Sequence, residues 1–265
     1  SDDEDEDEEV EEEEVPPPRR STRIAGSVLR PSRYAMTSTK VRCSGEQNGP
    51  RNVAIKQAEI VEIELLFLDL HALQPVQPEE MGEFEPLRSH MFAVKKFTAG
   101  GEFDKVKARM VANGNEHYPS LYPDKSSPTV AVHSILSCLT VAAYNNSYKM
   151  AKIDVKGAFI QTEMEGPPVY IKCDKCLTKL IVEVLPGLRK YVHKDGVLYC
   201  RLLKALYGCV QASKLWFNKL TKVLRREGYE HSPADPCVMR RIVGEKVFLL
   251  LIYVDDILIL ADAAE

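Results

Sequence analysis

The sequence contains no long hydrophobic run. Its longest, Val247 to Val254, falls far short of the ~18 residues that a membrane-spanning helix requires, so we expect no membrane partner. A secretory signal is not expected either, because residues 1–14 contain twelve Asp or Glu where a signal needs basic and apolar residues. The chain has 265 residues, 45% of them hydrophobic, which suffices for a sizeable core in one domain or slightly more.

The sequence also lacks a disulfide framework. Its seven cysteines are an odd number without regular spacing, which favours an intracellular, reducing location, cytoplasmic or nuclear. Cys173 and Cys176 form a CxxC pair, with His193 and Cys200 further along. Because no second CxxC follows and the spacing to His193 is loose, the pattern is not typical of a zinc site.

Negative charge is concentrated at one end of the chain. Without the twelve acids of residues 1–14, 27 Asp and Glu remain against 35 Lys and Arg, a net charge of about +8. A basic body suits a polyanion such as nucleic acid, although a solvated surface rich in lysine would have the same composition. We expect residues 1–52, which join the acidic run to Pro-, Ser- and Arg-rich segments, to form a disordered tail and linker.

Two adjacent aspartates lie between the most apolar segments of the chain. Residues 247–253 and 257–260 are rich in β-forming side chains and predict two strands joined by a tight turn at Asp255 and Asp256. Like charges beside buried strands raise a carboxylate pKa unless a cation neutralises them, and Mg²⁺ prefers such hard oxygen ligands. Ordinary turn aspartates are the competing interpretation, since Asp is common in turns.

A second predicted hairpin carries positive charge. Residues 91–113 contain two strand-like segments around a Gly-Gly turn. Lys105, Lys107 and Arg109 recur at every second position, so they share one face of the second strand. That face suits phosphate groups, with Arg109 as a two-point donor and the lysines as point charges. A solvated strand face is the alternative.

Further helices and strands are predicted around these hairpins. Residues 150–160 suggest a strand that carries Asp154, although Asp154 could instead cap a helix that begins near Gly157. Short strands are expected at residues 169–171 and 198–202. Helices are expected over residues 53–71 (ended by Pro75 and Pro78), over residues 130–146, and up to Gly228 with Trp216 on the core-facing stripe.

Four segments of the chain carry a family resemblance. They are residues 107–112 (Lys-Ala-Arg-Met-Val-Ala), 153–159 (Ile-Asp-Val-Lys-Gly-Ala-Phe), 203–216 (Leu-Lys-Ala-Leu-Tyr-Gly, continuing to Trp) and 235–256 (Asp-Pro-Cys-Val, leading to Tyr-Val-Asp-Asp). In order and spacing they resemble the reverse transcriptase domain of copia-type LTR retrotransposon polyproteins. The resemblance covers residues 53–265. Two positions depart from the family pattern, with Ser213 where Pro is usual and Gly157 where Thr is more usual.

The resemblance implies an α+β right-hand polymerase fold that ends before the thumb. The cationic hairpin would lie in the fingers, and an antiparallel sheet with packed helices would form the palm. Asp154, Asp255 and Asp256, together with Val155, would hold two Mg²⁺ ions, or Mn²⁺ in their place. These ions would activate the primer 3′-hydroxyl and stabilise the leaving pyrophosphate.

The resemblance also implies a set of contacts to the substrates, which would be an RNA or DNA template–primer and dNTPs. Lys107 and Arg109 would contact the phosphates, and Phe159 would crowd the position of a ribose 2′-hydroxyl. Tyr207 and Gly208 would line the nucleotide pocket. Gln211 would lie near the template, and Tyr253 would touch the primer terminus.

In such a polyprotein an integrase lies upstream, and the thumb and a ribonuclease H domain lie downstream. Because the resemblance ends before the thumb, we expect this fragment to extend a primer poorly by itself. Two other functions are compatible with the same residues. One is an inactive remnant that binds nucleic acid or a protein partner, and the other is a metal-dependent phosphatase or nuclease that uses the same carboxylates.

Overall fold

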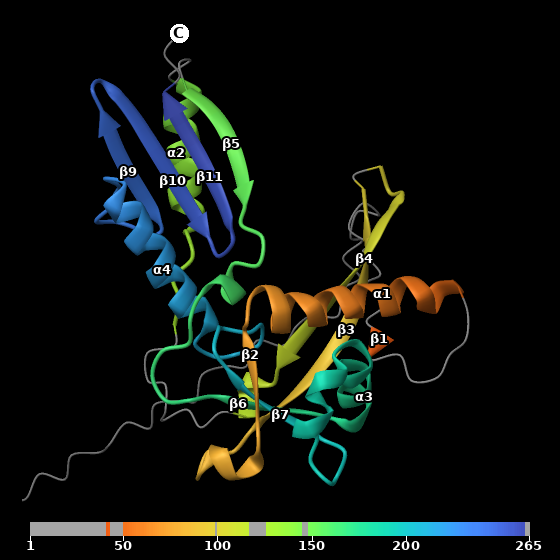
Figure 1. Ribbon diagram of the computed structural model, residues 1–265. Coiled ribbons are helices and arrows are strands. Elements are labelled where there is room, and N and C mark those ends of the chain that lie inside the picture. Colours follow the sequence, from red (N-terminus) through yellow and green to blue (C-terminus); the bar gives the residue numbers. More distant parts are fainter. Residues whose placement is uncertain (1–40, 43–49, 99, 117–125, 145–147, 263–265) are drawn as a thin grey trace, which may run out of the picture. The chain divides into compact units, whose positions relative to one another are not determined.

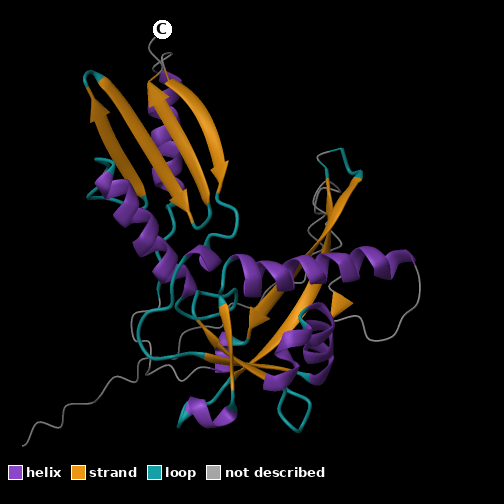
Figure 2. Ribbon diagram, viewed as in Figure 1, coloured by secondary structure: helices purple, strands orange, loops and turns teal. Residues whose placement is uncertain are grey.

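The computed structural model consists of two β-sheets with helices packed against them (Figures 1 and 2). The predicted α+β class is confirmed. Among the described residues no helix is both long enough and apolar enough to cross a membrane. The predicted tail lies mostly outside the described residues. The structure describes residues 41–42, 50–98, 100–116, 126–144 and 148–262.

The first sheet contains the cationic hairpin. In spatial order its strands are β1 (Val41–Arg42), β3 (Leu87–Phe97), β6 (Tyr170–Cys173), β7 (Leu198–Leu202) and β2 (Leu73–Val76), with β4 (Phe103–Ala112) paired to β3. All neighbours are antiparallel except β3 and β6. Helices α1 (Pro50–Glu64) and α3 (Lys175–Val184) supply Ile63 and Ile181 to its core, which also contains the fully buried Met110.

The second sheet contains the two aspartates of the apolar hairpin. Its antiparallel strands are, in spatial order, β5 (Tyr148–Asp154), β11 (Asp256–Asp262), β10 (Lys246–Tyr253), β9 (Val238–Val243) and β8 (Glu230–His231). Helix α2 (Val132–Tyr144) lies behind this sheet in Figure 1, and helix α4 (Ala212–Arg226) packs against the same core. Leu139 of α2 and Leu220 of α4 pack against a core that contains the buried Met239 and Leu251.

Short helical turns connect these elements. A π-helical turn at Leu65–Asp69 continues α1, and Asp174 caps α3 by accepting a hydrogen bond from the Leu177 N–H at 2.8 Å. The helix up to Gly228 is confirmed, with Trp216 only 5% exposed. The 3₁₀ turns are Pro78–Met81, Gly114–Glu116, Phe159–Gln161 and Pro186–Tyr191.

The structure corrects two predictions about local structure. Pro75 does not end a helix but lies within β2, which is an edge strand, so its missing N–H costs no interior hydrogen bond of the sheet. No α-helix begins near Gly157. Instead Asp154 is the last residue of β5, and only a 3₁₀ turn follows at Phe159–Gln161, so Asp154 is not a helix cap.

Candidate functional site

Strands β10 and β11 are joined by a strained two-residue turn. Tyr253 pairs with Asp256, which leaves Val254 and Asp255 as the turn residues. Val254 has φ +58°, and Asp255 is not among the residues with positive φ. Positive φ at the first turn position alone is typical of a type II′ turn, where Gly is usual. A β-branched residue in this region costs about 1–3 kcal/mol, and such strain is concentrated at functional sites.

The register of the second sheet brings Asp154 to the same turn. Asp154 on β5 is the direct partner of Asp256 on β11. Directly opposed residues of antiparallel strands extend their side chains from the same face of the sheet. The Val155 N–H donates to the Asp255 carbonyl oxygen at 3.0 Å, which ties the end of β5 to the turn. Residues about a hundred positions apart in the sequence therefore meet at one end of this sheet.

A cationic side chain already contacts one of the aspartates at this end of the sheet. Lys152 Nζ lies 2.9 Å from Asp256 Oδ1, and this hydrogen bond and the charge of Asp256 raise the pKa of Lys152. Among the described residues no three His, Cys, Asp or Glu side chains converge as a ready metal site. The donors nevertheless fit a hard divalent ion, because Asp154, Asp255 and Asp256 are partly or fully exposed oxygen ligands.

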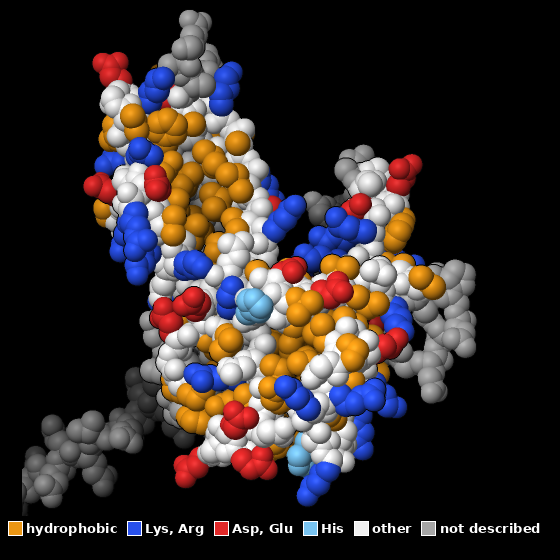
Figure 3. Space-filling model, viewed as in Figure 1, with side chains coloured by type: hydrophobic (Ala, Val, Ile, Leu, Met, Phe, Trp, Pro, Cys, Tyr) orange, Lys and Arg blue, Asp and Glu red, His pale blue; other side chains and the backbone are white. Residues whose placement is uncertain are grey.

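A cavity of about 1150 Å³ extends from Asp154 to the cationic strand β4. Lys105, Lys107 and Arg109 all line it, and Figure 3 shows Lys and Arg side chains gathered beside β4. Burial and the charges of Arg109 and Lys96 lower the pKa of Lys107. A bound polyanion would relieve the repulsion among these side chains.

Two aromatic rings continue the line of side chains from Arg109. Its guanidinium carbon lies 4.9 Å from the centre of the Tyr207 ring, and the Phe159 ring centre lies 5.2 Å from that of Tyr207. Burial raises the pKa of Tyr207. A guanidinium stacked on an aromatic face is held in a fixed plane, with N–H donors left for a phosphate.

The segment that carries Tyr207 is pressed against the end of β4. The Ala112 N–H donates to the Tyr207 carbonyl oxygen at 2.9 Å, and the Gly114 N–H donates to the Gly208 carbonyl oxygen at 3.1 Å. Gly208 has φ +87°, and a Cβ atom there would lie 2.0 Å from the Ala112 carbonyl oxygen. A Cβ at Gly114 would lie 2.1 Å from the Gly208 carbonyl oxygen, so both glycines are required.

Several predicted site residues do not line the cavity. Among the contact residues these are Phe159, Gly208, Gln211 and Tyr253, and among the three aspartates they are Asp255 and Asp256. Gln211 is only 5% exposed, and its side-chain amide atoms have no hydrogen-bond partner among the described residues. Tyr253 is 55% exposed at the end of β10. Neither residue lines the cavity, whereas Lys107, Arg109 and Tyr207 do.

The sequence alone does not reveal the structural roles of two acidic residues. Glu62 of α1 lines the cavity and accepts a hydrogen bond from the Met110 N–H at 3.2 Å, and burial raises its pKa. Burial alone would raise the pKa of Asp235 as well, but hydrogen bonds from Ala131, Ser134 and Cys237 lower it. No local motif marks Glu62, because its partner lies on another element of the fold, and Asp235 is marked only as part of the Asp-Pro-Cys-Val segment that carries the family resemblance.

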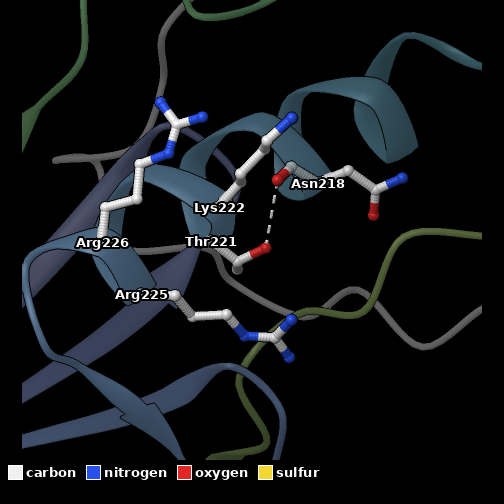
Figure 4. A pocket seen from close by; sticks show the side chains of 5 residues that line it. All are labelled: Asn218, Thr221, Lys222, Arg225 and Arg226. Atoms are coloured by element: carbon white, nitrogen blue, oxygen red, sulfur yellow. Dashed lines mark hydrogen bonds between the residues drawn. The ribbon is translucent and has the colours of Figure 1, made fainter.

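A second cavity, of about 490 Å³, lies on α4 (Figure 4). The cations that line it are exposed, and Thr221 Oγ1 donates hydrogen bonds within the same helix. None of the predicted site residues belongs to it. Its lining residues are Asn218, Thr221, Lys222, Arg225 and Arg226.

Known proteins are similar to this chain in sequence. The model of the family Reverse transcriptase (RNA-dependent DNA polymerase) matches residues 88–265. The Retrovirus-related Pol polyprotein from transposon RE2 of Arabidopsis thaliana is 35% identical over 167 residues, 62% of this chain and 10% of the relative. The corresponding polyprotein from transposon RE1 of the same plant is 34% identical over 167 residues, again 62% of this chain and 10% of the relative.

A third relative extends the comparison to another plant. The Retrovirus-related Pol polyprotein from transposon TNT 1-94 of Nicotiana tabacum is 31% identical over 157 residues, 58% of this chain and 11% of the relative. The chain thus spans about a tenth of the length of the curated relatives it matches. Because the family model matches well over half of the chain, the predicted resemblance is confirmed, and the chain belongs to the reverse transcriptase family found in retrotransposon Pol polyproteins.

Proposed function

We propose that this chain is an RNA-directed DNA polymerase domain that transfers nucleotides to a primer by two-metal catalysis. The observation that carries the proposal is the register that sets Asp154 opposite Asp256 beside the strained turn. Asp154 also lines the cavity whose other side is the cationic strand β4. A metal-binding carboxylate and phosphate-binding cations around one space are what nucleotidyl transfer needs.

The metal-binding role would fall to the end of the second sheet. Asp154, Asp255 and Asp256, with Val155, would hold two Mg²⁺ ions, and Lys152 would have to release Asp256 for this to happen. When bound, such ions lower the pKa of the attacking hydroxyl and neutralise charge on the leaving pyrophosphate. The strained turn and the Val155 hydrogen bond hold the aspartates in place.

The nucleotide-binding role would fall to the cavity. Arg109, fixed in its plane by Tyr207, and Lys107 would bind the triphosphate. Phe159 packs on Tyr207 and would crowd the ribose 2′-hydroxyl. Gly208 keeps Tyr207 close to β4, while Tyr253 and Gln211 would contact the primer and the template.

The two sheets would correspond to two parts of a right-hand polymerase. The first sheet with its cationic hairpin would be the fingers, and the second sheet with α2 and α4 would be the palm. Residues 53–265 would form this domain. Its partners would be a template–primer, dNTPs and the other segments of a Pol polyprotein, among them an integrase, a thumb and a ribonuclease H domain.

Primer extension tests the proposal. The 265-residue chain is incubated with Mg²⁺, dNTPs and a DNA primer on an RNA template, and addition of the complementary nucleotide is measured. We expect slow addition dictated by the template, and a loss of at least about a hundredfold in Asp154→Asn and Asp255→Asn. Asp262→Asn is the matched control, because Asp262 lies on the same strand as Asp256 at its far end.

Metal binding provides a second measurement for a slow enzyme. Titration with Mn²⁺, followed by electron paramagnetic resonance in the presence of a dNTP, counts the bound ions. We expect two ions per chain, with both affinities weakened in Asp255→Asn and neither in Asp262→Asn. Extension or Mn²⁺ binding that is unaffected by Asp255→Asn would overturn the proposal.

A further inference from the structure

We propose that Trp216 is a positioning residue for the turn that carries the aspartates. This role rests on the proposed function, because it concerns the direction of the metal-binding carboxylates. Trp216 lies on α4 and is the only tryptophan of the chain. Its indole Nε1–H donates to the carbonyl oxygen of Val254 at 2.8 Å. The side chain is 5% exposed, so water cannot easily replace it as the donor.

The accepted carbonyl belongs to the peptide that decides the type of turn. Val254 and Asp255 are the two central residues, and the peptide between them carries the Val254 oxygen. If this peptide turned over, the type II′ turn would become type I′, in which the second central residue also has positive φ. That residue is Asp255. The direction of its side chain from the backbone would change with it.

Two hydrogen bonds from different elements therefore hold the turn. The Trp216 indole binds the carbonyl of Val254, and the Val155 N–H binds the carbonyl of Asp255 at 3.0 Å. The Val155 bond comes from β5, whose last residue, Asp154, would be a metal ligand itself. The Trp216 bond comes from a different element, so it fixes the turn relative to the helix beneath the sheet.

Simple packing is the competing explanation for Trp216, since its side chain is only 5% exposed. The neighbouring Phe217 separates the two roles. It packs against the core of the second sheet, and its side chain has no hydrogen-bonding group. Trp216→Phe removes the N–H donor but keeps an aromatic ring, whereas Phe217→Leu removes packing and leaves the donor intact.

The experiment measures amide hydrogen exchange by nuclear magnetic resonance in the 265-residue chain, together with Mn²⁺ affinity. In Trp216→Phe we expect the Val155 and Asp256 amides to exchange about tenfold faster, the factor that corresponds to loss of one ordinary hydrogen bond. We expect Mn²⁺ affinity to fall by a similar factor. In Phe217→Leu, amide exchange at the turn and Mn²⁺ affinity should each change by no larger a factor than amide exchange at the centre of β9 does.

The outcomes separate this inference from the proposed function. Unchanged exchange at the turn in Trp216→Phe, or a change that Phe217→Leu reproduces, overturns the positioning role. If the wild-type chain binds no Mn²⁺ through its aspartates while exchange at the turn still responds to Trp216→Phe alone, the proposed function fails. The indole then only secures the turn, and the positioning of metal ligands is overturned with the function.

Discussion

Gly208→Ala is the substitution whose cost the structure defines best. The residue has φ +87°, and an added Cβ would lie 2.0 Å from the Ala112 carbonyl oxygen and 2.6 Å from Val111 Cγ1. An Ala in the left-handed region costs about 1–2 kcal/mol. The backbone shift that relieves the overlap adds about 1–3 kcal/mol. The expected loss is therefore roughly 2–5 kcal/mol of the free energy of unfolding, a large part of the stability of a typical domain.

Gly101→Ala is the matched control. Gly101 has the same φ of +87°, but nothing lies within 4 Å of the position of its Cβ. This variant carries the conformational cost alone. Urea unfolding followed by circular dichroism should show a lower midpoint in both variants, with the larger shift in Gly208→Ala and an unchanged dependence on denaturant.

The same substitution should also affect the cavity. Displacing Gly208 from Ala112 moves Tyr207, whose carbonyl accepts the Ala112 N–H and whose ring lies against Arg109. Binding of a dNTP with Mg²⁺ should weaken by about tenfold or more in Gly208→Ala and remain unchanged in Gly101→Ala. Equal losses of stability in the two variants would refute the steric reasoning, whatever happens to binding.

Three further substitutions test other parts of the structure. Asp235→Asn should lower the free energy of unfolding by about 1–3 kcal/mol. Because the pKa of Asp235 is lowered in the folded chain, the wild-type advantage should disappear as the pH falls through that pKa, which urea midpoints across acidic pH would show. Glu62→Gln should stabilise the chain at neutral pH, because burial raises the Glu62 pKa, and this gain should vanish on acidification; a less stable variant at neutral pH contradicts the assignment. Arg109→Lys should weaken dNTP binding about tenfold in equilibrium titrations, since Lys lacks the planar donors that stack on Tyr207, and equal affinity would contradict that role.

The hairpins could be predicted because their signals are local. Apolar runs on both sides of Asp255 and Asp256 specify β10 and β11, and alternation along β4 places Lys107 and Arg109 on one face. The pairing of Asp154 with Asp256 is not local. It was inferred from the resemblance to a family, because no periodicity in β5 reveals which strand will be its neighbour.

Other features could not be predicted because they depend on tertiary contacts. Pro75 was expected to end a helix, but an edge strand tolerates proline, and only the sheet order shows that β2 is an edge. Glu62 resembles any polar residue of a helix until the fold buries it over Met110. Gly114 is required only because the chain returns at Gly208, nearly a hundred residues later.

The turn at Val254 shows how the second sheet supports a strained conformation. The strain of about 1–3 kcal/mol is similar to the combined value of the two hydrogen bonds to the turn, at about 1 kcal/mol each. The flanking strands add stability that does not depend on the turn, because Leu250, Leu251 and Ile252 are at most 5% exposed. A glycine would remove the strain, because Gly is the usual residue at the first central position of a type II′ turn. The sheet and the indole together therefore hold the turn in a conformation that valine by itself disfavours, and the adjacent aspartates are held with it.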